Sequence, residues 1–145
     1  MKIVIISPFQ FRLRRGIERF VFSLSNQLIK NHNYKIVLYC WTAKNEIDWG
    51  EWNEKIIIKW VPFSRYFQDI IASFFYKLWI KNDTPELILI NFLYHGEQLL
   101  PRKYKYLYVL HSPASQVPDR YKFIGRNLKK FTNLDFVAVS KIVKT

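Results

Sequence analysis

Cysteine, glycine and long apolar runs are all scarce in this sequence. Cys40 is the only cysteine, which excludes an internal disulfide and a cysteine-rich metal site and fits a reducing compartment. Four glycines and six prolines exclude fibrous and low-complexity classes. No stretch approaches the roughly 18 uninterrupted apolar residues of a membrane span, and the N-terminal apolar run is too short for a signal peptide. We therefore expect a cytoplasmic protein that lies at most peripherally on the inner membrane face.

Acidic residues are few as well. Eleven Asp and Glu stand against 23 Lys and Arg, which gives a formal net charge of +12. Such an excess attracts nucleic acids, anionic lipid surfaces and phosphorylated small molecules. The basic residues are spread along the chain, with local clusters at Arg12-Arg14-Arg15 and Lys129-Lys130. Spread charge favours a solvated surface over a nucleic-acid groove, so we expect no nucleic-acid partner.

The remaining composition is that of a folded domain. In the first part of the sequence, the apolar residues change from a strand pattern to a helical pattern and back. Half of the 145 residues are hydrophobic and 18% are aromatic, which suits one domain with one core. Lys2 to Ser7 is a β-branched run ended by Pro8, typical of a strand buried on both faces. Apolar residues then recur at helical spacing from Ile17 to Lys30, and Tyr34 to Trp41 predicts a second strand. Strand, helix and strand form a βαβ unit.

The alternation continues to the end of the chain. Further strands are expected at Lys55–Val61, Leu87–Asn91, Lys105–Leu110 and Leu134–Val139, with helices at Ser64–Ile80 and Asp119–Phe131, and Ser140 can cap one more helix. This order predicts a single α/β domain with a Rossmann-like, doubly wound parallel sheet in three layers, α/β/α.

Ligands of open parallel sheets bind beyond the carboxyl ends of the strands. Three segments occupy that position: Ser7–Gly16, Asn91–Gly96 and His111–Pro118. A glycine at a helix start lets an anion approach free N–H groups, although periodicity alone favours a plain helix cap or turn at Gly16. One glycine instead of three makes a dinucleotide fingerprint a poor match. The three histidines lack metal-ligand spacing, and each alone is more often structural than functional.

The helix expected at Ser64–Ile80 carries an apolar stripe with basic residues beside it. The stripe consists of Phe67, Ile70, Ile71, Phe74, Phe75 and Leu78, and it is flanked by Arg65, Lys77 and Lys81. Packing against the sheet explains the stripe with the fewest assumptions. Docking at a lipid interface is the alternative.

Five short motifs follow one another in order along the chain. They are Lys2–Ser7 with Pro8, Gly16-Ile17-Glu18-Arg19-Phe20-Val21, the helix end that leads into Asn31–Val37, Tyr108-Val109-Leu110-His111-Ser112, and Phe136-Val137-Ala138-Val139-Ser140-Lys141. Together they resemble the N-terminal domain of the GT-B glycosyltransferases, in particular the family-four retaining group. Arg15 stands where that group has the first glycine of a pair.

This resemblance implies that residues 1–145 are the N-terminal, acceptor-side domain of a glycosyltransferase. A C-terminal donor-binding domain, in cis or in trans, would complete the enzyme, and the fragment alone should be inactive. A nucleotide sugar would be the donor, a glycan or lipid-linked molecule the acceptor, and no metal or other cofactor is expected. The donor phosphates and sugar would contact Arg15, Gly16, Glu18, His111 and Ser112, and the acceptor would contact Asn91 and His95.

The transition state of such a transfer has oxocarbenium character, and positive groups help the departing diphosphate. The resemblance suggests Arg15 as the source of that charge. The competing hypothesis is a non-catalytic Rossmann-like module that docks to an anionic membrane surface or to a partner protein. Self-association into a homodimer remains open under both hypotheses.

Overall fold

A computed structural model describes most of the chain, namely residues 1–11, 15–41, 48–62, 68–91, 96–111, 119, 122, 126 and 128–138. In chain order the elements are β1 (Lys2–Ile6), α1 (Gly16–His32), β2 (Lys35–Trp41), β3 (Ile57–Val61), α2 (Gln68–Asp83), β4 (Leu87–Ile90), η1 (Glu97–Leu99), β5 (Tyr106–Leu110), η2 (Leu128–Lys130) and β6 (Leu134–Ala138). The two η elements are short 3-10 helices.

The six strands form one sheet in the order β3-β2-β1-β4-β5-β6, and every neighbouring pair is parallel. Ile3 of β1, for example, lies opposite Ile36 of β2 and Leu87 of β4. This is the strand order of a doubly wound Rossmann-like fold, so the predicted fold class is confirmed.

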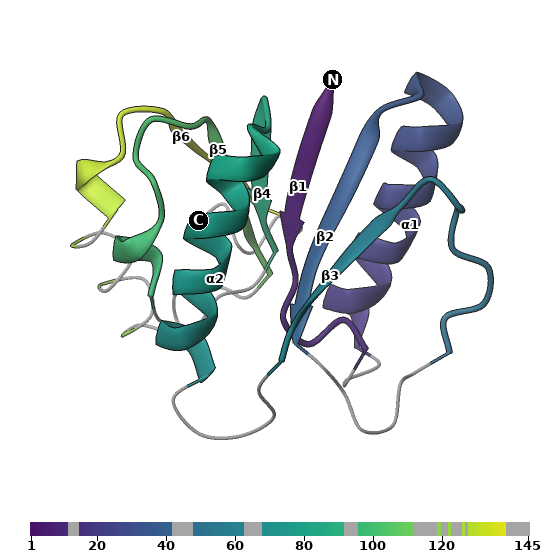
Figure 1. Cartoon of the computed structure of the whole chain (residues 1–145), viewed down its shortest axis with the longest axis horizontal. Helices are drawn as coiled ribbons and strands as arrows, with labels where there is room; N and C mark the ends of the chain where they lie inside the picture. The colour runs from purple at the N-terminus through teal and green to yellow at the C-terminus, as the bar shows by residue number, and fades with distance from the viewer. Residues whose placement is uncertain are drawn as a thin grey trace.

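The two central strands, β1 and β4, are apolar at every position except Lys2, because a helix covers each face of the sheet. Figure 1 shows α1 and α2 on opposite sides of the sheet. Ile3 and Ile5 of β1 belong to the core under α1, whereas Val4 and Ile6 belong to the core under α2. Continuous apolar runs, without alternation, are what a sheet buried on both faces requires.

Helix α1 turns its predicted apolar side toward the sheet. Val21 is buried there, and Phe20, Leu24 and Leu28 are partly buried against the same core; Ile29, which lies outside the predicted stripe, is buried as well. The helix ends at Asn33, whose left-handed backbone (φ 54°) lets its N–H donate to the Ile29 carbonyl at 2.9 Å. Asparagine tolerates this conformation better than most residues, which explains why the helix stops where the sequence predicted.

The prediction for the apolar stripe of α2 was wrong for four of its six members, whereas Phe75 packs partly buried against the core. Four of its members, Ile70, Ile71, Phe74 and Leu78, are exposed, and the residues packed against the sheet are Ala72, Ser73, Tyr76 and Ile80. The helix is apolar around most of its circumference, so periodicity offered two faces. The structure buries the one on which small residues allow close approach and on which Tyr76 stacks on Tyr39, with ring centroids 5.6 Å apart.

The strand boundaries differ from the predictions by a residue or two, as expected for element ends, and α2 ends at Asp83, three residues later than predicted. Strand β3 begins at Ile57, two residues later than predicted. Six of the thirteen residues of the helix expected at Asp119–Phe131 lie outside the described residues, as do Phe67 and Ser140, and the described end of that helix is the 3-10 helix η2. Among the described residues, no helix is long and apolar enough to cross a membrane.

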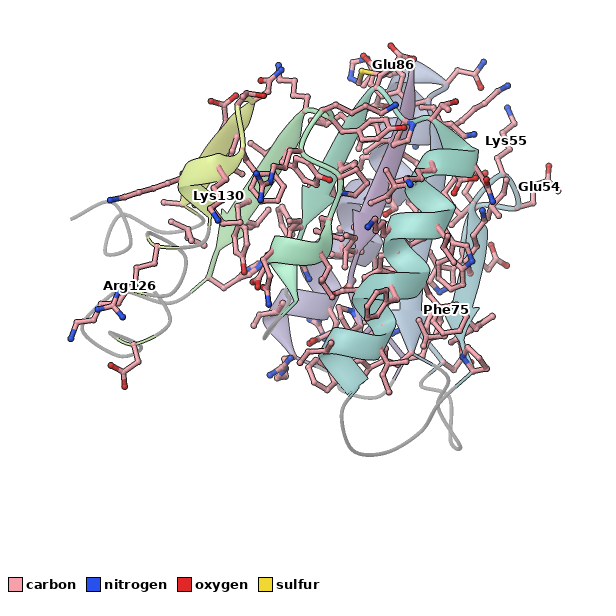
Figure 2. All side chains as sticks on the ribbon, turned by 60° about the vertical axis from the view of Figure 1, so that its left-hand side comes forward. Glu54, Lys55, Phe75, Glu86, Arg126 and Lys130 are labelled. Atoms are coloured by element: carbon pink, nitrogen blue, oxygen red, sulfur yellow. The ribbon has the colours of Figure 1, made fainter. Side chains whose placement is uncertain are left out.

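The charged side chains labelled in Figure 2 are widely separated on the molecule. Glu54 and Lys55 lie beside β3, Glu86 lies near the N-terminal end of the chain, and Arg126 and Lys130 lie beyond β5.

Candidate functional site

The site lies where the order of the strands in the sheet reverses, between β1 and β4. From β1 the chain crosses to β2, and from β4 it crosses to β5 on the other side, so the carboxyl ends of β1 and β4 flank the topological switch point. Ser7 follows β1 directly, and its N–H donates to the Tyr39 carbonyl at 3.0 Å. Asn91 follows β4, and its N–H donates to the Ile6 carbonyl at 3.0 Å. Crevices at such points are the usual ligand sites of this fold.

A buried polar network joins these two strand ends to the start of α1. The Asn91 side-chain amide donates to Ser7 Oγ at 3.2 Å and to the Ile17 carbonyl at 3.4 Å. Ser7 Oγ in turn donates to Gln10 Oε1 at 3.0 Å, and Gln10 Nε2 donates to the Glu18 carbonyl at 2.8 Å. Ser7, Gln10, Glu18 and Asn91 are each at most 1% exposed. A satisfied buried network of this kind fixes the geometry of its members.

His111, directly after β5, is attached to the same network. Its Nε2 lies 2.7 Å from Asn91 Oδ1. The Asn91 orientation is set by the Ile17 carbonyl, which can only accept and therefore faces the amide nitrogen. His111 Nε2 must then carry the proton, and in the neutral ring Nδ1 is the acceptor. The ring also meets the edge of Phe20, with centroids 5.8 Å apart.

The electrostatic surroundings keep His111 neutral at physiological pH. Burial lowers its pKa below the ordinary value of 6.5, because the charged imidazolium loses hydration. The nearby charges of Glu18 and Arg15 act on the pKa in opposite directions, Glu18 raising it and Arg15 lowering it. His111 is thus suited to accept a hydrogen bond through Nδ1 rather than to act as a cation.

Arg15 and Glu18 form a two-pronged ion pair at the start of α1. Arg15 Nη2 lies 2.6 Å from Glu18 Oε1, and Arg15 Nε lies 3.1 Å from Glu18 Oε2. The backbone N–H of Arg15 also donates to Glu18 Oε2 at 3.2 Å, which caps the helix. The Glu18 side chain is 1% exposed and the Arg15 side chain 42%. The pair carries no net charge, and the Arg15 guanidinium also lies 5.6 Å from the centre of the Phe9 ring.

Gly16 lies between these two residues as the first residue of α1, and it is open to approach. A Cβ atom added there would meet nothing within 4 Å. The first N–H groups of a helix have no acceptors within the helix and lie at the positive end of its dipole. The space above Gly16 is therefore favourable for an anion.

The structure brings together five of the seven predicted site residues: Arg15, Gly16, Glu18, Asn91 and His111. His95 and Ser112 lie outside the described residues. The predicted ligand contacts of all seven remain predictions. The geometry adds a role for Asn91, which holds His111 through Oδ1.

Sequence reasoning missed Ser7 and Gln10 as members of the network. Both lie in the segment Ser7–Gly16 that was singled out, but neither was named. Ser7 could have been identified from its position, because it is the first polar residue after the buried apolar run of β1. Gln10 had no local signal, because its partners are set by the turn that follows β1.

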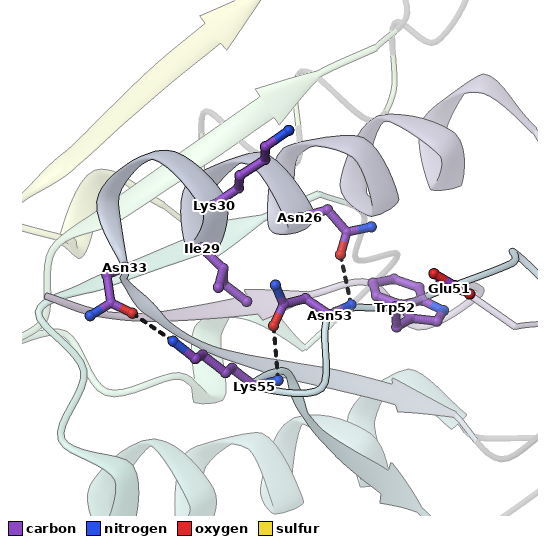
Figure 3. A pocket seen from close by; sticks show the side chains of 8 residues that line it. All are labelled: Asn26, Ile29, Lys30, Asn33, Glu51, Trp52, Asn53 and Lys55. Atoms are coloured by element: carbon purple, nitrogen blue, oxygen red, sulfur yellow. Dashed lines mark hydrogen bonds between the residues drawn. The ribbon is translucent and has the colours of Figure 1, made fainter.

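A hollow lies away from this network, beside the C-terminal half of α1. Figure 3 shows its lining residues, which are Asn26, Ile29, Lys30, Asn33, Glu51, Trp52, Asn53 and Lys55. Its amides serve the chain itself, since Asn53 N–H donates to Asn26 Oδ1 at 2.9 Å and Lys55 Nζ donates to Asn33 Oδ1 at 3.1 Å. These bonds attach the segment before β3 to α1, which is a structural task.

No protein-family model matches this chain, and no curated protein resembles it significantly in sequence. Within the described ranges, no three His, Cys, Asp or Glu side chains come together as a metal-binding group. The fold and the polar network are therefore the observations from which function has to be argued.

Proposed function

We propose that this chain is the N-terminal, acceptor-side half of a GT-B glycosyltransferase that moves a sugar from a nucleotide-sugar donor to a glycan or lipid-linked acceptor. The observation that supports this most is the convergence of three loops at the switch point. Asn91 after β4 contacts Ser7 after β1 and His111 after β5, and it also reaches the first turn of α1. Two of the motifs that resemble the family, at 16–21 and 108–111, lie at this edge of the sheet, whereas the motif at 31–37 lies at the opposite edge, where β2 begins.

In this proposal the donor diphosphate lies over Gly16. The open space there and the free N–H groups of α1 favour a phosphate. Arg15 then acts differently from the sequence expectation, because it is already paired with Glu18. It neutralises a carboxylate that would otherwise repel the diphosphate, and Ser112 remains a predicted further contact.

His111 contacts the transferred sugar in this proposal. A neutral imidazole with Nε2 bound to Asn91 presents Nδ1 as an acceptor for a sugar hydroxyl. Asn91 is a positioning residue here, since it fixes both the tautomer and the ring orientation. Direct contacts of Asn91 and His95 with the acceptor remain predictions from the resemblance.

The proposal is tested by supplying a donor-binding domain, in the same chain or as a partner subunit, and measuring sugar transfer with a panel of nucleotide sugars. We expect nucleoside diphosphate release from the two-domain protein and none from the chain alone. His111→Ala should lower release strongly, whereas Gln27→Ala, at an exposed position on α1, should leave it unchanged. A two-domain protein that releases no nucleoside diphosphate from any member of the panel would sink the proposal.

A further inference from the structure

Helix α2 carries an apolar surface that no described part of the chain covers. Ile70, Ile71, Phe74 and Leu78, called here the α2 ridge, are 47%, 37%, 52% and 58% exposed. The opposite side of the same helix packs in the core, where Ala72, Tyr76 and Ile80 are completely buried. The ridge is therefore surplus to the packing of the domain.

The spacing of the ridge makes it one continuous strip. Ile70, Phe74 and Leu78 follow each other at intervals of four residues, so their side chains lie along one side of the helix. Single exposed apolar residues are ordinary on protein surfaces, but a contiguous strip marks an interaction site. Helix α2 lies on the outside of the sheet, so the strip is accessible along the length of the helix (Figure 1).

The charges on the ridge side of the helix are basic. Lys77 and Lys81 lie seven residues after Ile70 and Phe74, which places each lysine on the side of the helix that carries the ridge. The two acidic residues of α2 are Asp69, directly before Ile70, and Asp83 at the end of the helix; none lies between them. Asp83 binds Lys59 Nζ at 2.8 Å and its side chain is 13% exposed. The result is an apolar strip with two lysines on its own side of the helix.

The apolar strip and its lysines favour an anionic lipid surface over a second copy of the chain as the partner of the α2 ridge. A second copy of the chain would bring another +12 charge and two more lysines against the first pair, which opposes pairing through this face. An anionic lipid surface complements both parts, because the apolar side chains enter the boundary between headgroups and acyl chains while the lysines meet lipid phosphates. We propose that the α2 ridge docks this domain on an anionic membrane surface, with α2 lying in the plane of the interface.

The first test is vesicle flotation of the full 145-residue chain with neutral phosphatidylcholine vesicles and with vesicles containing phosphatidylglycerol. We expect flotation with the anionic vesicles and little with the neutral ones. Phe74→Glu/Leu78→Glu should lower the partition coefficient by about a hundredfold or more, because apolar burial is lost and two like charges are added. Both positions are exposed, so circular dichroism should show an intact fold.

The matched control is Gln27→Glu/Asn31→Glu, which makes the same charge change at exposed positions of α1, on the other side of the sheet. It should retain most of the binding. In a second arm, Lys77→Gln/Lys81→Gln should weaken binding about thirtyfold, and Arg19→Gln/Lys30→Gln on α1 should weaken it much less.

Three results would overturn the proposal. They are a wild-type chain that floats with neither vesicle, equal losses in the α2 and α1 variants, and dimers or a protein complex that Phe74→Glu/Leu78→Glu separates while vesicles are ignored. The last result would assign the ridge to a protein partner. None of these outcomes depends on sugar transfer, so this inference and the proposed enzymatic role can fail separately.

Discussion

Replacing Gly16 by alanine separates the stability of the fold from the binding of a phosphate. Gly16 is the first residue of α1, and a Cβ there meets nothing within 4 Å. Alanine restricts the unfolded chain and suits a helix, so the free energy of unfolding should rise by roughly 0.5 kcal/mol. In a domain of this size the melting temperature should then rise by about 1–2 °C.

The same methyl group points into the space assigned to the donor diphosphate. If a phosphate approaches the backbone there, the methyl forces it away from the helix N–H groups. We expect kcat/KM for the nucleotide sugar in the two-domain protein to fall tenfold or more, equivalent to about 1.4 kcal/mol or more of lost binding.

Urea unfolding of the chain and steady-state kinetics of the two-domain protein measure the two effects. Gly50→Ala is the matched control, because its Cβ is equally unobstructed but its φ of 86° strains any other residue. Gly50→Ala should lower stability by about 1 kcal/mol and leave kcat/KM unchanged. If Gly16→Ala leaves kcat/KM unchanged, the phosphate does not lie over Gly16. If it lowers stability instead, the described start of α1 is wrong.

Three further predictions concern individual side chains. Burial lowers the pKa of His111, so the unfolded chain binds a proton at this residue more readily than the folded chain does. The contribution of neutral His111 to the free energy of unfolding should therefore be complete above about pH 6.5 and decline as the pH falls below that value. Urea unfolding at several pH values should show this part of the slope disappear in His111→Gln, and an unchanged slope would contradict the described burial. Glu18→Ala should cost about 2–3 kcal/mol in urea unfolding, because it removes a buried carboxylate that accepts three hydrogen bonds and caps α1; a loss under 1 kcal/mol would contradict this. Cys40 is completely buried and its pKa is raised by burial, so the thiol should resist Ellman's reagent in the native chain and react on unfolding; rapid native labelling would count against the core.

The sheet was predictable because its signals are local. A buried parallel strand needs only a short apolar run, and β1 and β4 each have one that is ended by a polar residue. The alternation of strands and helices predicted that the sheet is parallel and doubly wound, whereas the strand order came from the structure. The helical face of α1 was equally clear, because its opposite side is polar.

Two features could not be predicted, the buried side of α2 and the polar network, because both depend on contacts between residues that are far apart in the sequence. Helix α2 is apolar on two sides, so its periodicity could not say which side meets the sheet, and close packing of Ala72 beside Tyr76 decided it. The network depends on contacts between distant positions, such as Asn91 with Ser7, which are 84 residues apart. Nothing in either local sequence encodes that pairing; the parallel sheet produces it.

The most direct measurement for the account is NMR of the isotope-labelled two-domain protein, titrated with the nucleotide sugar that it uses. The account predicts that the largest shifts in this chain occur at the backbone amides of Gly16 and Ile17 and at the His111 ring. Shifts concentrated around Trp52 and Asn53, in the hollow beside the other end of α1, with Gly16 and His111 unmoved, would contradict it.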